Sequence, residues 1–266
     1  MERDETRGCQ AVVAEAIDAT REAGEVYLVN PSAPLVVAAV RYLDQTSDVS
    51  LRLVAPKRRL DAALDGFYHR SLAADVVAAD RAAIRAGDVP SSTAVVSAAG
   101  VTPIVSIDGT TALGRLDDSS VAAELVEAAA AVWRDAAEYP IREPALSVAR
   151  DGLADQFGEA VREDFDAALD QRPGMDGTVL VLLVAAAHGL QLYRVSKWGE
   201  DIGIGARATF SRRKTGLEDS GVLETELIEM DVGRPRHRLQ LTEEYADLAV
   251  SEVVQRVGPD DWSRQQ

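Results

Sequence analysis

Residues 25–69 alternate twice between a short apolar run and an amphipathic helical segment. EVYLV at 25–29 and VSLRLV at 49–54 have the length and composition of strands, and a helical pattern that begins beside a proline follows each of them. Strand, helix, strand, helix in such close succession is the pattern of a βαβ unit, in which the two strands lie side by side and parallel. The pattern therefore predicts an α/β sheet with its helices packed on the faces.

The middle of the chain has a different pattern. Three short β-rich runs are separated by the dipeptides AG and DG, which predicts antiparallel hairpins, and a helical segment with an Asp/Ser start follows; these lie at 91–98, 101–107, 111–116 and 118–137. EYPIREP at 138–144 has the two prolines of a linker. We therefore predict a mixed α/β domain over 1–145, which senses a signal or dimerises, and a second domain over 150–258.

Charge and apolar content limit where the chain can reside. It carries 44 acidic residues against 28 basic ones, a formal net charge of -16, and its lysines are Lys57, Lys197 and Lys214. An acid excess with so little lysine suggests adaptation to high salt, in which acidic surfaces stay hydrated. The N-terminus has no apolar signal core, and the longest apolar run, 179–187, is far shorter than the roughly 20 residues of a membrane span. We expect a soluble, cytoplasmic protein with no membrane partner.

Three consecutive helical segments occupy 178–190, 193–204 and 206–219. A short helix, a glycine turn and a further helix form the helix-turn-helix pattern, whose second element lies in the major groove of DNA. Phe210 and Leu217 are two turns apart and are expected to face the core. The polar and basic side chains that this leaves for DNA are Arg207, Thr209, Ser211, Arg212, Arg213 and Lys214, since arginine, serine and threonine bind base edges and phosphates.

A basic hairpin is predicted directly after these helices. Apolar residues alternate at 222–232 and 236–241 on either side of GRP at 233–235, and Arg234, Arg236 and Arg238 lie near its tip, beside His237. Neither 205–216 nor 232–241 contains an acid, although the chain has 44. A basic hairpin after a recognition helix is typical of a wing that contacts the DNA backbone or minor groove. The partner we expect is therefore double-stranded DNA.

SKWGEDIGI, ATFSRRKTGLEDSG and DVGRPRHRLQL resemble segments of the TbsP-type (TrmB-suppressor) family of transcriptional regulators of halophilic archaea. The resemblance spans most of the chain and is strongest at 178–241. It implies an α/β N-terminal domain, a C-terminal winged helix-turn-helix domain, and regulation of central sugar metabolism beside a sugar-responsive regulator. Lys214 departs from the apolar residue that winged helices often have there, and Gly216 costs a helix about 1 kcal/mol.

The N-terminal domain contains one further candidate site. NPSAP and APKRR follow the two parallel strands, so both turns are expected at the same sheet edge, where ligands tend to bind. Helix N-termini bind anions. Ser32, Lys57, Arg58 and Arg59 are therefore a candidate site for a phosphorylated metabolite, although the same cations would also suit an exposed helix start or a dimer contact.

Other classes of function have weaker support. No nucleophile, phosphate-binding or metal-ligand motif occurs, and His69, His188 and His237 are far apart in the sequence, so we expect neither an enzyme nor a cofactor or metal. His188 and Trp198 are expected to be packed in the interior. A non-catalytic interaction module that partners another regulator stays open as the alternative. Since winged-helix regulators commonly bind paired half-sites, we expect a homodimer, with 118–137 and a terminal helix at 243–257 as candidate surfaces.

Overall fold

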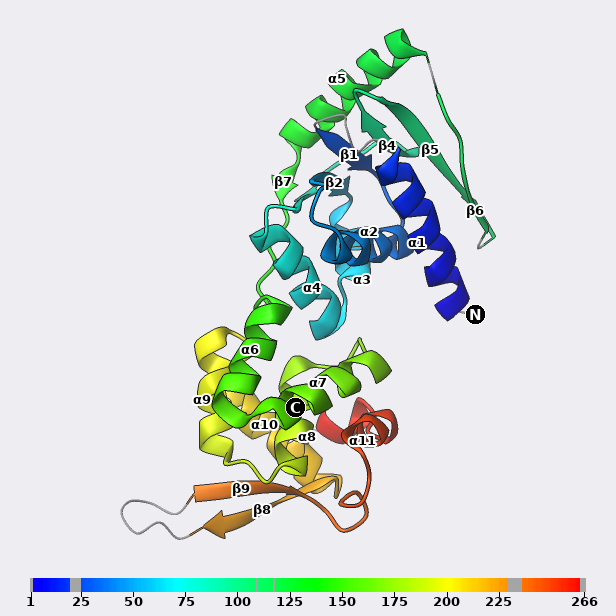
Figure 1. Ribbon diagram of the computed structural model, residues 1–266. Coiled ribbons are helices and arrows are strands. Elements are labelled where there is room, and N and C mark those ends of the chain that lie inside the picture. Colours follow the sequence, from blue (N-terminus) through cyan, green and yellow to red (C-terminus); the bar gives the residue numbers. More distant parts are fainter. Residues whose placement is uncertain (1, 20–24, 109, 117, 229–235, 264–266) are drawn as a thin grey trace. The chain divides into compact units, whose positions relative to one another are not determined.

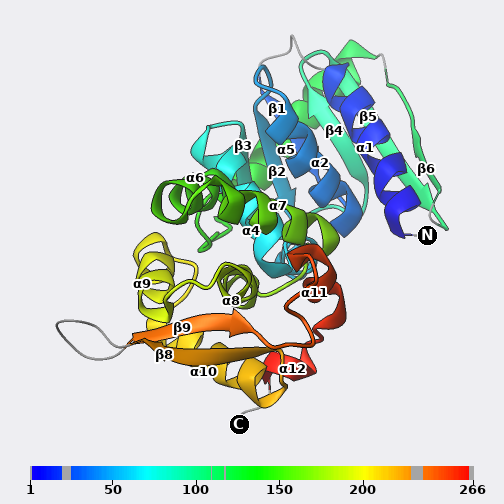
Figure 2. The same cartoon turned by 60° about the horizontal axis from the view of Figure 1, so that its bottom comes forward.

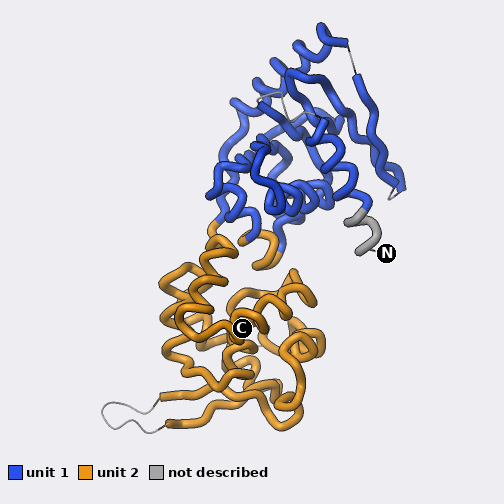
Figure 3. Tube along the Cα trace, in the orientation of Figure 1, with its two compact units in different colours: residues 1–65, 72–141 blue, residues 66–71, 142–266 orange. Residues whose placement is uncertain are grey.

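The computed structural model describes residues 2–19, 25–108, 110–116, 118–228 and 236–263. The chain divides into two compact units, which Figure 3 shows in different colours. Unit 1 contains residues 1–65 and 72–141, and unit 2 contains residues 66–71 and 142–266.

Unit 1 is built on a seven-stranded mixed sheet with the order β6-β5-β4-β1-β2-β3-β7 (Figure 1). Its centre is parallel, because β1 pairs with β2 and β2 with β3 in that sense, while β4, β5, β6 and β7 join antiparallel. The strands are β1 (Val26–Val29), β2 (Leu51–Ala55), β3 (Ala82–Ala86), β4 (Thr93–Ser97), β5 (Gly100–Ile107), β6 (Thr110–Leu113) and β7 (Ala137–Glu138). The predicted parallel pair and the predicted hairpins are confirmed.

Helices cover both faces of this sheet (Figure 2). α5 (Ser119–Asp135) packs Ala122, Ala129 and Trp133 against Tyr27 and other side chains of one face. α1 (Glu2–Asp18) and α2 (Ala33–Gln45) pack against each other on the opposite face. The short helix α3 (Lys57–Ala63) follows β2, and α4 (Gly66–Ala78) leads into β3.

Two features of unit 1 differ from the sequence prediction. The single helix expected after β2 is interrupted, because α3 ends before Leu64 and α4 starts at Gly66, a residue with a φ of 79°. Residues 82–86 form strand β3, which lies between β2 and the edge strand β7 and which the sequence prediction did not include. The N-terminal helix expected at 10–23 is confirmed up to Asp18, and residues 20–24 lie outside the described residues.

Unit 2 is a helical domain with a two-stranded antiparallel sheet. Its elements are α6 (Leu146–Phe157), α7 (Glu159–Gln171), α8 (Gly177–Ala187), α9 (Leu192–Ile202), α10 (Arg207–Asp219), β8 (Leu223–Ile228), β9 (Arg236–Leu241), α11 (Val250–Arg256) and α12 (Asp260–Ser263). α8 is the core of the unit: it is buried from Gly177 to Ala186 and packs against α7, α10, α11 and β9. The order α8, α9, α10, β8, β9 is that of a winged helix, so the predicted fold class is confirmed.

Two helices of unit 2 are shorter than the patterns predicted. The helix expected at 153–170 is divided into α6 and α7, since Gly158 takes a φ of 104° between them. The terminal helix expected at 243–257 begins only at Val250. Its apolar residues Val250, Val253 and Val254 are buried and the helix packs on α7 and α8, so this side is not an open dimer surface.

Candidate nucleic-acid interface

α9 and α10 form a helix-turn-helix pair. α9 buries Val195 and Trp198 and ends at Gly203, whose left-handed backbone (φ 91°) reverses the chain. α10 begins four residues later and buries Phe210 and Leu217 completely. The predicted burial of these two side chains and of Trp198 is confirmed, so α10 is held with one face in the core and the other outward.

The inward face of α10 also contains Arg213 and Lys214, although Arg213 was predicted to turn outward and both were predicted to contact DNA. Residues three, four and seven positions apart share one side of a helix, so the periodicity that buries Phe210 and Leu217 places 213 and 214 between them. Both cations are bound to carboxylates of unit 2. Their side chains are therefore mostly covered by the domain, Arg213 being 24% exposed and Lys214 14% exposed.

Arg213 holds α10 to two neighbouring elements. Its Nη2 lies 2.9 Å from Oδ2 of Asp176, and its Nη1 donates to the carbonyl oxygen of Trp262 at 3.2 Å. The other carboxylate oxygen of Asp176 accepts from the backbone N–H groups of Thr178 and Val179 and so caps α8. The guanidinium thus links the start of the central helix to α10.

Lys214 lies against the first strand of the wing. Its side chain is only 14% exposed, and its Nζ is 2.6 Å from Oε2 of Glu218, one turn along the same helix. Thr225 of β8 donates to the same carboxylate. The departure from an apolar residue at 214 is thus accommodated by an ion pair, with the lysine stem packed inward.

The outward face of α10 contains Arg207, Ser211 and Arg212. All three are exposed, whereas Thr209 is half-buried. Arg207 is paired with Glu200 of α9, since its Nε lies 2.6 Å from Oε2. Among the described residues, Arg212 is the cation of α10 that makes no ion pair with a carboxylate.

The basic strand of the wing is tied to the start of α9. Leu239 N donates to the carbonyl oxygen of Leu190 at 2.9 Å, and Gln191 forms a β-bridge with Arg238. The guanidinium of Arg236 donates to Oε1 of Gln191 at 3.2 Å and lies 5.0 Å from the centre of the Tyr193 ring.

The remaining wing residues differ in their surroundings. His237 is exposed. Arg238 is 3.5 Å from Glu226 of β8, and this distance suits a weak, solvent-exposed ion pair. Arg234 lies outside the described residues.

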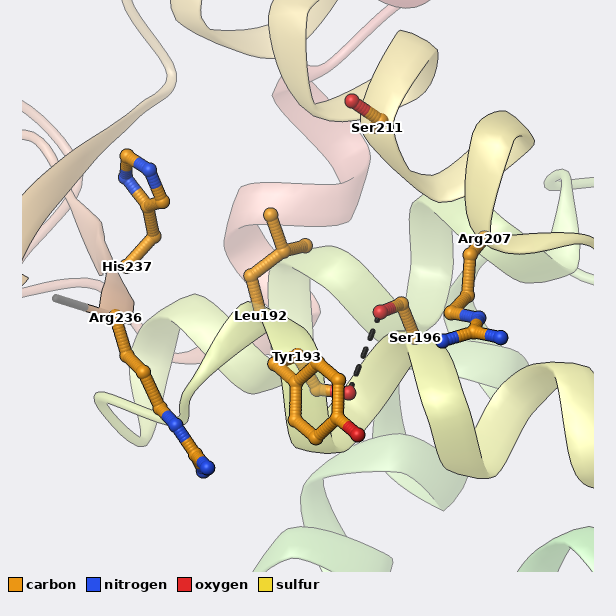
Figure 4. A pocket seen from close by; sticks show the side chains of 7 residues that line it. All are labelled: Leu192, Tyr193, Ser196, Arg207, Ser211, Arg236 and His237. Carbon is orange, nitrogen blue, oxygen red and sulfur yellow. Dashed lines mark hydrogen bonds between the residues drawn. The ribbon is translucent and has the colours of Figure 1, made fainter. Parts of the chain in front are cut away.

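A groove of about 550 Å³ runs between α9, α10 and β9 (Figure 4). It is lined by Leu192, Tyr193, Ser196, Arg207, Ser211, Arg236 and His237. The structure thus brings together Arg207 and Ser211 of the helix with Arg236 of the wing.

Three of these lining residues, Leu192, Tyr193 and Ser196, were not recognised in the sequence. Tyr193 is 49% exposed, and its carbonyl oxygen accepts from the Ser196 hydroxyl at 3.4 Å. The signal for them was available, because 192, 193 and 196 recur at helical spacing beside the buried Val195 and Trp198.

The candidate anion site of unit 1 is partly occupied by the protein's own groups. The turns after β1 and β2 do lie side by side, because Nη1 of Arg59 donates to the carbonyl oxygens of Asn30 and Pro31 at 3.2 Å. Nζ of Lys57 is 2.8 Å from Oδ2 of Asp61. Arg58 is exposed and Ser32 is half-buried without a side-chain cap bond. Arg59 and Lys57 therefore stabilise their own turn and helix.

Other kinds of functional site have little support among the described residues. His188 is half-buried, with Nε2 2.8 Å from Oδ2 of Asp164. No group of three or more His, Cys, Asp or Glu side chains that could hold a metal ion occurs in the described part of the chain. Within the same ranges, no helix is both long and apolar enough to cross a membrane.

Comparison with known proteins identifies the family. Residues 4–144 match the model of the N-terminal domain of TbsP-like transcriptional regulators, and residues 145–258 match that of their C-terminal helix-turn-helix domain. No curated protein matches the chain.

One solved structure is similar at a low level. It is that of TrmBL2, described as an archaeal chromatin protein that shows a novel mode of DNA binding, with 15% identity and a TM-score of 0.34 over 49% of this chain and 52% of that one. So slight a likeness carries no argument about function. The family models cover nearly the whole chain, and the first alone covers more than half of it, so the protein belongs to the family of TbsP-like transcriptional regulators.

Proposed function

We propose that this DNA-binding transcriptional regulator recognises specific double-stranded sequences through the face formed by α9, α10 and β9. The observation that carries the proposal is the groove that brings Arg207 of α10 together with Arg236 of the wing, in a chain of net charge -16. Arg212 adds a further exposed cation on α10. Ser211 and Tyr193 add a hydroxyl and an aromatic ring to the same face. Arginine can donate two hydrogen bonds to guanine, and basic side chains on a wing bind phosphates.

The proposal is tested by mapping the bound sites across the genome and measuring binding to a mapped site by fluorescence anisotropy. The double variant Arg212→Ala/Arg236→Ala removes two cations from the face. Arg256→Ala removes one from the exposed end of α11, outside the groove. We expect the first to lose most of the affinity and the second to retain it. If the full chain bound no DNA at any salt concentration, the alternative of an interaction module that partners another regulator would be favoured.

The regulated genes are proposed from the family resemblance. We expect promoters of central sugar metabolism, in glycolysis and gluconeogenesis, among the mapped sites. A phosphorylated metabolite is the proposed effector, with Arg58 and Ser32 as its contacts at the edge where β1 and β2 end. Calorimetric titration with a panel of sugar phosphates tests this, and binding that survives in Arg58→Ala would exclude the proposed site.

A homodimer is proposed because paired half-sites are commonly read by two copies. Val105 and Ile107 of β5, which are 53% and 72% exposed, are the apolar contact proposed for a second copy. Val121 and Leu125 of α5 are each 38% exposed. Val105 and Ile107 share the sheet face of Val101, which packs with the α5 cluster. Residues 101–113 contain a single acid, Asp108, so the repulsion between two chains of charge -16 is weak there.

Light scattering in high salt tests the dimer. Ile107→Glu is expected to give a monomer, whereas Val148→Glu, on the exposed side of α6, is expected to leave the oligomeric state unchanged. An unchanged mass for both variants would exclude this surface.

Adaptation to high salt is proposed from the acid excess. We expect the melting temperature to rise with KCl concentration up to molar levels, because screening weakens the repulsion among 44 acids.

A further inference from the structure

An acidic side chain lies at the start of the recognition helix, where a negatively charged DNA duplex would dock. α10 has Ala206 at its N-cap position and therefore no side-chain cap of its own. Glu200 of α9 supplies the missing acceptor: Oε1 accepts from the backbone N–H of Arg207 at 3.2 Å. These bonds to Arg207 hold the pKa of Glu200 below its ordinary value, the backbone N–H having the largest effect, so the carboxylate stays charged.

The same carboxylate fixes the direction of the Arg207 side chain. Oε2 of Glu200 accepts from Nε of Arg207 at 2.6 Å. In the described structure the two terminal nitrogens, Nη1 and Nη2, make no hydrogen bond to the protein. Arg207 is 53% exposed and lines the groove with Ser196 and Ser211 (Figure 4). The guanidinium is therefore held by one edge with its other donors free.

An arginine held in this way is suited to a base edge. The free donors form a planar pair that matches the O6 and N7 acceptors of guanine, and a fixed side chain loses less conformational freedom on binding than a mobile one. A phosphate in the same place would approach the Glu200 carboxylate and be repelled. The pair thus favours a correctly placed base over indiscriminate backbone contact.

We propose that Glu200 is a positioning residue that determines sequence specificity, by orienting Arg207 for a base contact and by penalising non-specific phosphate contact. The inference rests on the proposed function, since it needs α10 to face DNA. Asp201 provides a matched control, because this exposed neighbouring acid is paired with Lys197 at 2.5 Å and does not contact Arg207 in the described structure.

The experiment compares the full-length wild type with Glu200→Gln and Asp201→Asn. Anisotropy measures binding to a mapped site and to a scrambled duplex over a range of KCl concentrations. Both variants remove one negative charge and should bind the scrambled duplex more tightly. Glu200→Gln should in addition lower the ratio of specific to non-specific affinity by about tenfold, the scale of one lost bidentate contact. Asp201→Asn should leave that ratio unchanged.

Two further measurements separate positioning from a structural role. Gln keeps an oxygen acceptor for the Arg207 N–H, so the melting temperature of Glu200→Gln should match that of the wild type. In an Arg207→Ala background, Glu200→Gln should cause no further loss of the ratio. The inference would be overturned if wild type and Glu200→Gln had the same ratio of specific to non-specific affinity. It would also be overturned if Asp201→Asn lowered that ratio as much as Glu200→Gln does. A wild type that does not discriminate the two duplexes would instead overturn the proposed function, and this inference with it.

Discussion

Nη2 of Arg213 lies 2.9 Å from Oδ2 of Asp176, so α10, the second helix of the helix-turn-helix pair, is bonded to the carboxylate that caps the central helix α8. A basic residue that looks in the sequence like a DNA contact is therefore part of the framework of the domain. Arg212, its neighbour, points outward and makes no ion pair among the described residues. Substitution by alanine is therefore expected to change DNA affinity at Arg212 and the stability of the domain at Arg213.

Arg212→Ala should weaken binding to a mapped site by about 1–3 kcal/mol through the loss of a bidentate base contact, with an unchanged melting temperature. Arg213→Ala should lower the free energy of unfolding by about 1–3 kcal/mol, because the half-buried Asp176 carboxylate and the Trp262 carbonyl lose their donor. Anisotropy and denaturant unfolding measure the two effects. If Arg213→Ala weakened DNA binding without loss of stability, the structural assignment of Arg213 would be wrong.

Arg236→Ala should weaken binding to every DNA sequence by a similar factor, because a wing arginine that contacts phosphate has no base to read. The slope of log affinity against log salt should fall by about 0.9 for the lost phosphate contact. Arg236→Lys is the control: it keeps the charge, and so the slope, while losing the planar contact with Tyr193. A variant whose loss is confined to the mapped site would indicate a base contact instead.

Gly216→Ala should destabilise unit 2 although alanine favours helices by about 1 kcal/mol. A Cβ at 216 would lie 2.9 Å from Cα of Trp262, so backbone would have to shift, at a cost of about 1–3 kcal/mol. Gly8→Ala is the matched control, because Gly8 lies within the helix α1 and a Cβ there would meet no atom within 4 Å. This variant should therefore gain the helix propensity of alanine and stabilise unit 1. Chemical unfolding of both variants tests the prediction, and a stabilised Gly216→Ala would contradict the close approach.

Asp118→Asn should lower the melting temperature of unit 1 near neutral pH. Asp118 caps α5, and its bonds to the Ser120 hydroxyl and then to the Val121 and Ser120 N–H groups lower its pKa below the ordinary value of an aspartate. Because the pKa of Asp118 is lower in the folded state than in the unfolded state, its carboxylate stabilises the fold at any pH above its unfolded-state pKa. That stability is lost as the pH falls through its folded-state pKa. The difference between wild type and variant should therefore shrink in acid. Melting curves at pH 7 and below pH 3.8 measure it, and a difference independent of pH would show that the charge does not matter.

Much of the fold could be predicted from local pattern. The parallel β1–β2 pair follows from strand–helix alternation, and the hairpins of β4, β5 and β6 from turn dipeptides between β-rich runs. β3 was missed because AAIRA is short and lies between a helix and a loop, where its partner β2 supplies the pairing that makes it a strand. The break at Gly158 was missed because an apolar period continues across it.

The candidate site could be predicted in outline only. The positions of Arg207 and Arg212 follow from the charge and spacing of α10. Arg213 was assigned outward, and Lys214 was assigned to the DNA contacts, because both are cations, although the spacing of Phe210 and Leu217 already placed them inward. Arg213 pairs with Asp176, which tertiary packing brings next to α10. Lys214 pairs with Glu218, one turn further along the same helix. Glu200 could not be recognised, because no local pattern pairs residue 200 with a helix that starts at 207.

The bridge between Gln191 and Arg238 makes the wing a continuation of the first helix of the motif. Arg236 and Tyr193, which are stacked across that junction, share one mechanical unit. If DNA docks as proposed, a displacement of the basic strand would therefore be transmitted to the first turn of α9.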